Sequence, residues 1–110
     1  MSTHFPIPTG RGDLLVALGG NALSPAKGTG TIDEQIGITR RTVRTLARLA
    51  LPGVRLVITH GNGPVVGNIL LRNEAAAGQV PVMPLDVCGA DSQGGLGYMI
   101  QQALENELFL

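Results

Sequence analysis

The 110-residue sequence has few aromatic residues and little lysine: it contains no tryptophan, one tyrosine, two phenylalanines and a single lysine, Lys27. Without aromatic rings, the core must be built from leucine, valine, isoleucine and alanine. Hydrophobic residues make up 44% of the chain and charged residues 15%, a globular composition that excludes a disordered protein. We therefore expect one small aliphatic domain, or a piece of a larger one.

Three further absences restrict the environment and the partners. Cys88 is the only cysteine, so no intrachain disulfide can form and a reducing compartment is the default. No apolar run reaches the roughly 18 residues of a spanning helix, and residues 1–13 contain no apolar signal segment. The formal net charge is zero, which argues against a nucleic-acid partner or an acidic membrane surface. We expect a soluble, cytoplasmic protein.

Two largely apolar segments, residues 13–18 and 54–59, predict strands that are buried on both faces of a sheet, because their apolar residues do not alternate with polar ones. Between them, apolar residues recur at helical spacing from residue 32 until the Pro52-Gly53 pair, and Thr31 and Glu34 have the spacing of a capping box. The glycine- and serine-rich loop 24–30 is expected to be mobile. A strand, a crossover helix and a second strand form one βαβ unit, so the strands must be parallel.

Two more helices are predicted after the second strand. Pro64 suits the first turn of one helix, which Gly78 ends, and Asp86 is expected to be the N-cap of the other. The glycines at positions 94, 95 and 97 are expected to let this last helix pack closely against a neighbouring backbone, with a ligand-facing role as the alternative. Two strands do not complete an α/β sheet, so we expect the next strand after Leu110 and exposed apolar strand faces in the chain alone.

Several polar residues are expected to have structural roles. Arg40, Arg44 and Arg48 recur every four residues and are expected to form a solvated helix face, with a subunit contact as the alternative. Cys88 is expected to be a packed thiol and not a nucleophile. His60 follows the second strand, where a hydrogen-bonded structural histidine is commoner than a catalytic base.

The most informative residues follow the two predicted strands. The first strand ends in Gly19-Gly20-Asn21 and the second in Gly61-Asn62-Gly63. A strand that ends in a glycine-rich turn presents backbone N–H groups beyond the sheet edge, where α/β proteins bind small anions and phosphoryl groups. Because neighbouring parallel strands end at the same edge, the pair of turns predicts one small-molecule site, with both asparagines able to hydrogen-bond the ligand.

A purely structural role and a dinucleotide site account less well for the pair of turns. Either turn alone fits a tight loop that needs residues tolerating positive φ and close approach. Residues 61–67 superficially match a dinucleotide-binding fingerprint, but they follow the second strand, and Pro64 removes a backbone N–H from the turn. No Gly-Lys-Ser/Thr triplet occurs, which excludes a Walker A loop.

Short segments occur in a characteristic order and spacing: residues 16–23 (VALGGNAL), 60–64 (HGNGP), 66–68 (VGN), 83–86 (MPLD), 93–94 (QG) and 96–98 (LGY). Together they resemble carbamate kinase, a member of the amino acid kinase superfamily, from about residue 14 to residue 108. Many superfamily members carry lysine at the position of Ala17. Carbamate kinases usually carry alanine there, as this chain does. The combination of segments is specific, whereas either turn alone is not.

The resemblance implies a three-layer, parallel-sheet α/β fold, of which residues 14–110 would be the N-terminal βαβαα portion after a tail of residues 1–13. It implies a homodimeric enzyme of arginine metabolism that interconverts ATP and carbamate with ADP and carbamoyl phosphate, using Mg²⁺. The residues that would line the carbamate and phosphoryl side of the site are Gly19, Gly20, Asn21, Gly61, Asn62 and Gly63.

The resemblance also implies that the nucleotide-binding half and the catalytic lysines lie beyond Leu110, and no metal ligand is assigned within this chain. We therefore expect half a site and no useful kinase activity from the chain alone. Two alternatives stay open: another amino acid kinase, such as one acting on acetylglutamate, and a non-catalytic remnant that binds anions or docks on a complete subunit. The missing first-turn lysine and residues 60–64 count against the first alternative.

Overall fold

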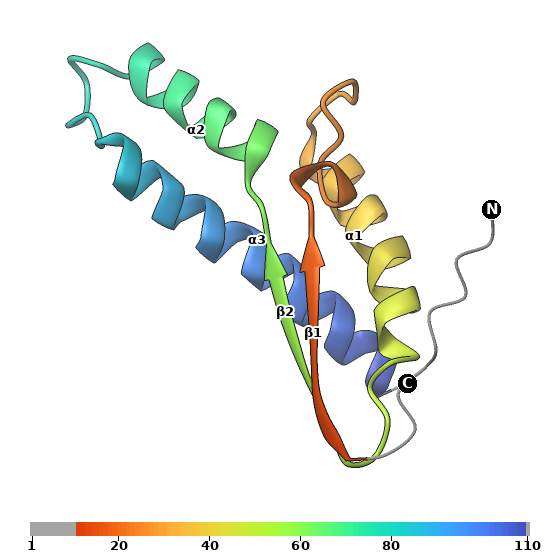
Figure 1. Cartoon of the computed structure of the whole chain (residues 1–110). Helices are drawn as coiled ribbons and strands as arrows, with labels where there is room; N and C mark the ends of the chain where they lie inside the picture. Colours follow the sequence, from red (N-terminus) through yellow and green to blue (C-terminus); the bar gives the residue numbers. More distant parts are fainter. Residues whose placement is uncertain (1–10, 110) are drawn as a thin grey trace.

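The computed structural model describes residues 11–109 (Figure 1). The elements are, in order, β1 (Gly12–Leu18), the 3₁₀ turn η1 (Gly20–Ala22), α1 (Ile32–Ala47), β2 (Val54–His60), α2 (Gly63–Ala75) and α3 (Leu85–Leu108). The predicted parallel α/β arrangement and the βαβαα order are confirmed. The predicted tail, residues 1–13, lies for the most part outside the described residues, and β1 already includes its last two positions.

The strands β1 and β2 form a two-stranded parallel sheet in the described part of the chain. The register pairs Leu15 with Val57 and Leu18 with His60. The last paired residues are therefore the last residues of both strands, and the two turns leave the sheet at the same end (Figure 1). The fold thus places η1 and the start of α2 next to each other.

Burial alternates along both strands, so the prediction of strands buried on both faces is wrong for the described chain. Leu18 and Ile58 pack against the helical core, whereas Leu15 is 66% exposed and Val57 is 50% exposed on the opposite face. The physical reason is that the helices among the described residues cover one face only. The expected exposure of apolar strand residues in the chain alone is confirmed.

Local sequence signals explain how α1 begins. Thr31 is its N-cap, and its Oγ1 accepts a hydrogen bond of 3.3 Å from the Glu34 N–H. The Glu34 carboxylate in turn accepts hydrogen bonds from the Gly30 N–H at 2.7 Å and the Thr29 hydroxyl at 3.0 Å. The capping-box prediction is confirmed, with the carboxylate reaching the residue before the cap. It also ties the preceding loop to the helix.

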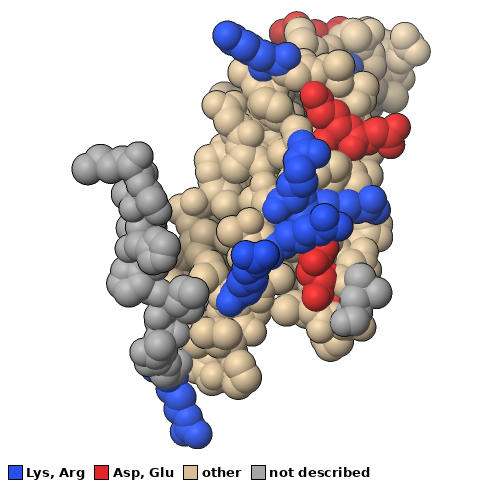
Figure 2. All heavy atoms as spheres, turned by 90° about the vertical axis from the view of Figure 1, so that its right-hand side faces the viewer, with Lys and Arg blue, Asp and Glu red and all other residues tan. Residues whose placement is uncertain are grey.

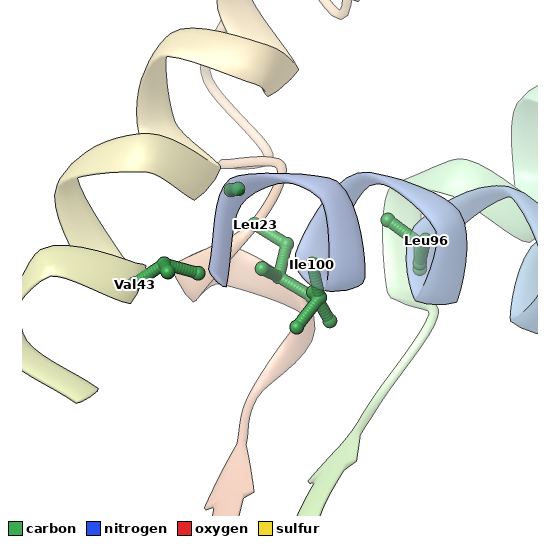
Figure 3. Close-up of a cluster of buried hydrophobic side chains, with 5 residues drawn as sticks. Leu23, Val43, Leu96 and Ile100 are labelled. Atoms are coloured by element: carbon green, nitrogen blue, oxygen red, sulfur yellow. The ribbon is translucent and has the colours of Figure 1, made fainter. Parts of the chain in front are cut away.

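The core lies between α1, α3 and the segment after the first turn. Leu23, Val43 and Leu96 are almost fully buried, and Ile100 and Ala103 complete the cluster (Figure 3). The buried residues of α3 recur at helical spacing: Cys88, Ser92, Leu96, Ile100 and Ala103. This burial keeps α3 helical although glycines weaken its first half. Cys88 is a free, buried thiol, as predicted.

Two predictions about α3 are wrong. The N-cap is Pro84, and Asp86 lies within the first turn. There the positive end of the helix dipole stabilises its carboxylate. The glycines at 94, 95 and 97 do not mark close packing against a neighbouring backbone, because a Cβ built at any of them meets no atom of another described element within 4 Å. Spacing alone does not distinguish a glycine in a tight contact from one in open space.

Arginines gather on the outer face of α1 (Figure 2). Arg40, Arg44 and Arg48 are exposed, as expected for a solvated face. Arg44 also reaches across to α3, where its Nε lies 3.0 Å from Glu107 Oε1. Such a partly exposed ion pair contributes little to stability, so the apolar cluster beneath it holds α1 and α3 together. No helix among residues 11–109 has the length and apolarity needed to cross a membrane.

Candidate functional site

The two glycine-rich turns lie in backbone contact with each other. The Gly61 N–H donates a 2.8 Å hydrogen bond to the Leu18 carbonyl oxygen, which continues the sheet ladder into the second turn. A Cβ built on Gly20 would lie 3.0 Å from the Gly63 nitrogen, and one built on Gly61 would lie 3.2 Å from the Gly20 nitrogen. Glycine is therefore favoured at positions 20 and 61 by this close approach. Backbone conformation does not demand it, since neither residue has a positive φ.

The contact brings unpaired backbone donors together. The N–H groups of Gly20 and Gly63 donate no hydrogen bond to another described residue. Both residues stand at the start of a helical element, η1 and α2, where the first N–H groups have no intrahelical acceptor. Donors at a helix N-terminus attract negative charge, and α2 adds the positive end of its dipole. The arrangement can therefore bind a small anion between the turns.

A hydroxyl group from a neighbouring helix ties each turn in place. The Thr42 hydroxyl of α1 donates a 2.9 Å hydrogen bond to the Ala22 carbonyl oxygen in the first turn. In the second turn, Asn62 Nδ2 donates a 3.0 Å hydrogen bond to Ser92 Oγ of α3. The Ser92 hydroxyl itself donates to the Gly89 carbonyl oxygen at 2.6 Å. The two turns are thus held by two different helices.

The sequence-predicted residues differ in their surroundings. Gly19 and Asn21 are exposed, and Gly20 is half-buried against the second turn. Asn62 is half-buried and is the N-cap of α2, yet its side chain makes no capping hydrogen bond and pairs with Ser92 instead. The structure therefore brings both predicted turns together, while the Asn62 amide nitrogen is directed at α3.

Sequence reasoning did not find Thr42 or assign a role to Ser92. Thr42 lies within a helix pattern, where threonine gives no signal of a long-range contact. Ser92 lies at helical spacing from Cys88 and Leu96 on the buried face, and a hydroxyl on that face was the only signal of its role. A fully buried serine needs a hydrogen-bond partner, but the sequence does not identify which one.

His60 has a local hydrogen bond. Its Nδ1 lies 3.1 Å from the Gly61 carbonyl oxygen, the next residue along the chain. This contact is consistent with the structural role expected for it. Residues 11–109 contain no group of three or more His, Cys, Asp or Glu side chains placed to hold a metal ion.

A cavity of about 150 Å³ lies between α1, α2 and α3, behind the second turn. Its lining is mixed: it combines apolar residues such as Ile69 and Met99 with Ser92 and with the charged residues Arg72 and Asp91. The predicted site residues of the two turns are absent from this lining. The cavity and the contact between the turns are therefore separate features.

These features define a parallel α/β protein in which unpaired backbone N–H groups gather at the carboxyl ends of the two described strands. Comparison with known proteins identifies the class of α/β protein that this chain resembles. Carbamate kinase of Pyrococcus horikoshii is 50% identical over 97 residues, covering 86% of this chain and 31% of the relative. Carbamate kinase of Giardia intestinalis is 46% identical over 93 residues. The resemblance to carbamate kinase is confirmed in sequence, although no family model matches the chain.

Solved structures agree with the sequence comparison. Carbamate kinase from Giardia lamblia bound to AMP-PNP superposes with a TM-score of 0.81 at 46% identity, covering 88% of this chain and 34% of that one. Another structure of the Giardia enzyme gives a TM-score of 0.82 at 45% identity. The chain thus has the α/β fold of the N-terminal third of carbamate kinases and spans about 31% of the curated relative's length.

Proposed function

We propose that this chain supplies the carbamate and phosphoryl side of a carbamate kinase active site, for the reaction of ATP and carbamate to ADP and carbamoyl phosphate. The observation that carries the proposal is the contact between the two turns, with the unpaired N–H groups of Gly20 and Gly63 at its centre. The relatives named above are carbamate kinases, so the acetylglutamate kinase alternative is not favoured.

Phosphoryl transfer depends mainly on positioning and on electrostatic stabilisation of the transferred group. In the proposed site, the backbone N–H groups of the two turns donate hydrogen bonds to oxygens of carbamate or of the phosphoryl group. The α2 dipole adds positive potential at the same point. Asn21, which is exposed beside the first turn, is the side chain of this set that is free to contact the ligand.

The remaining groups of the site are proposed to lie outside residues 1–110. Lys27 is the only lysine of the chain and lies in the exposed loop before α1. Lysines that neutralise the transferred phosphoryl group must therefore come from elsewhere in a complete enzyme. ATP or ADP with Mg²⁺ would supply or receive the phosphoryl group, and AMP-PNP binding by the Giardia enzyme supports a nucleotide site. By the same resemblance, the complete enzyme is proposed to be a cytoplasmic homodimer of arginine metabolism.

A chimera tests the proposal. Residues 1–110 replace the matching N-terminal segment of the Pyrococcus horikoshii carbamate kinase, and ATP formation from ADP and carbamoyl phosphate is measured. We expect the chimera to be active and the chain alone to be inactive, because the chain carries half of the donors. A folded, inactive chimera contradicts the proposed function, and ATP formation by the chain alone contradicts the division of the site.

A further inference from the structure

Two opposite charges stand at the mouth of the cavity between α1, α2 and α3. Arg72 of α2 and Asp91 of α3 both line the cavity, and both residues are exposed. Neither side chain forms an ion pair with another residue in the described part of the chain. The mouth therefore presents one cation and one anion, on two different helices, and each is available to a ligand.

The interior beneath the mouth is largely apolar. Leu96, which is 1% exposed, lines it together with Ile69. The Ser92 hydroxyl is also part of the lining, but it already donates to the Gly89 carbonyl oxygen and accepts from Asn62 Nδ2. An aliphatic group that enters this space leaves water for apolar contacts, which is favourable.

Gln35 lines the cavity from α1 and is 4% exposed. Its Nε2 donates a 3.2 Å hydrogen bond to the Gly30 carbonyl oxygen, and no described residue donates to its Oε1, which can accept from a ligand N–H group. The cavity volume of about 150 Å³ is about five times the ~30 Å³ that a water molecule occupies in the liquid. This volume suits a small metabolite and excludes a nucleotide.

We infer that this cavity binds a small zwitterion with an aliphatic body, which is the chemistry of an α-amino acid. The carboxylate pairs with the Arg72 guanidinium, the ammonium group pairs with the Asp91 carboxylate, and the aliphatic group contacts Leu96 and Ile69. An α-amino acid carries both charges on one carbon atom, so both stay at the mouth while the side chain enters the cavity. A simple anion or cation would leave one of the two charges at the mouth without a partner.

The test uses the ¹⁵N-labelled chain, L-valine as the probe, and two analogues that each lack one charge. Isovalerate lacks the ammonium group of valine, and isobutylamine lacks its carboxylate. The backbone amide signals of Ile69, Gly95 and Met99, which line the cavity, are followed by NMR at neutral pH up to tens of millimolar ligand. We expect L-valine to shift them and each analogue to bind about fivefold more weakly, the effect of one partly exposed ion pair.

Two substitutions assign the charges. Arg72→Gln should abolish the preference for L-valine over isobutylamine, and Asp91→Asn should abolish the preference for L-valine over isovalerate. Each variant should keep the other preference. Arg72 also lies in the last turn of α2, where a cation stabilises the helix, so the readout is the preference between ligands and not the affinity alone. Glu74→Gln is the matched control, because Glu74 is exposed on the same helix outside the lining and should affect neither preference.

Three outcomes would overturn the inference. The first is that L-valine shifts no amide of the cavity lining in the unmodified chain. The second is that L-valine binds no more tightly than either analogue, which would mean that the two charges are not recognised together. The third is that folded Arg72→Gln and Asp91→Asn keep both preferences. The proposed kinase function is tested by ATP formation in the chimera, so it stands or falls separately.

Discussion

A Cβ atom on Gly20 would lie 3.0 Å from the backbone nitrogen of Gly63, although 42 other positions separate the two glycines in the sequence. Contacts this short force a neighbouring group to move, and the neighbour in this case is backbone, which moves less easily than a flexible side chain. The spacing between the two turns is thus set by the absence of a side chain at position 20. Individual contacts of this kind affect the activity, the stability and the association of the chain.

The change Gly20→Ala should separate the two turns and disturb the proposed anion site. The neighbouring backbone must give by a few tenths of an ångström. We expect ATP formation by the chimera to fall by about threefold to tenfold, since a full displacement of about 1 Å can cost ~10²-fold in rate. Gly67→Ala is the control, because a Cβ at this position in α2 meets nothing within 4 Å. Equal activity of the two variants would show that the contact between the turns does not matter for catalysis.

The change Thr31→Ala removes the N-cap of α1. We expect the free energy of unfolding to fall by about 1 kcal/mol, the usual value for loss of a capping side chain. Urea denaturation followed by circular dichroism measures this change. Thr45→Ala, at an exposed position inside the same helix, should raise the free energy of unfolding by about 0.5 kcal/mol, because alanine has the higher helix propensity. A similar loss in both variants would mean that the cap does not stabilise the helix.

Replacing threonine by valine should have opposite effects on stability at positions 39 and 42. Thr39 Oγ1 is buried and has no hydrogen-bond partner among the described residues, whereas the Thr42 hydroxyl donates to the Ala22 carbonyl oxygen. Thr39→Val should therefore raise the free energy of unfolding by about 1 kcal/mol, and Thr42→Val should lower it by a similar amount. Thermal denaturation of the two variants checks the signs. Destabilisation by Thr39→Val would show that its hydroxyl has a partner in solution.

The open sheet face should make the chain associate. Leu15 and Val57 are register partners on this face and are 66% and 50% exposed. We expect Leu15→Lys to reduce association, measured as the concentration dependence of the sedimentation coefficient, because exposed apolar patches drive self-association. Leu71→Lys, at an exposed apolar position on α2, is the control. Dispersal by Leu71→Lys alone would place the contact on the helices.

Much of the fold followed from local patterns. The alternation of apolar runs and helical periodicity predicted β1, α1 and β2, and the Thr31–Glu34 spacing predicted where α1 begins. The N-cap of α3 was mistaken because Asp86 and Pro84 both fit a helix start, and the backbone geometry that decides between them is not a property of residue type. Exposure of apolar strand residues in the chain alone was predicted, but the alternation of burial along each strand was not. An apolar run does not reveal how many layers of the fold are present.

The site was predicted in part. The glycine patterns after the two strands indicated which turns would meet, because parallel neighbouring strands end at one edge. The sequence did not indicate that Asn62 would pair with Ser92, since that contact joins residues 30 positions apart and depends on how α3 packs. The contribution of the turns to substrate binding stays a prediction.

The anchoring of the first turn by Thr42 and of the second by Ser92 has a mechanical consequence. Each hydroxyl belongs to a different helix, and Val43 of α1 and Ile100 of α3 lie in the same buried cluster. A sliding of one helix along the other is therefore transmitted to the gap between Gly20 and Gly63. The packing of α1 against α3 therefore sets the width of that gap, although neither helix needs to touch the ligand.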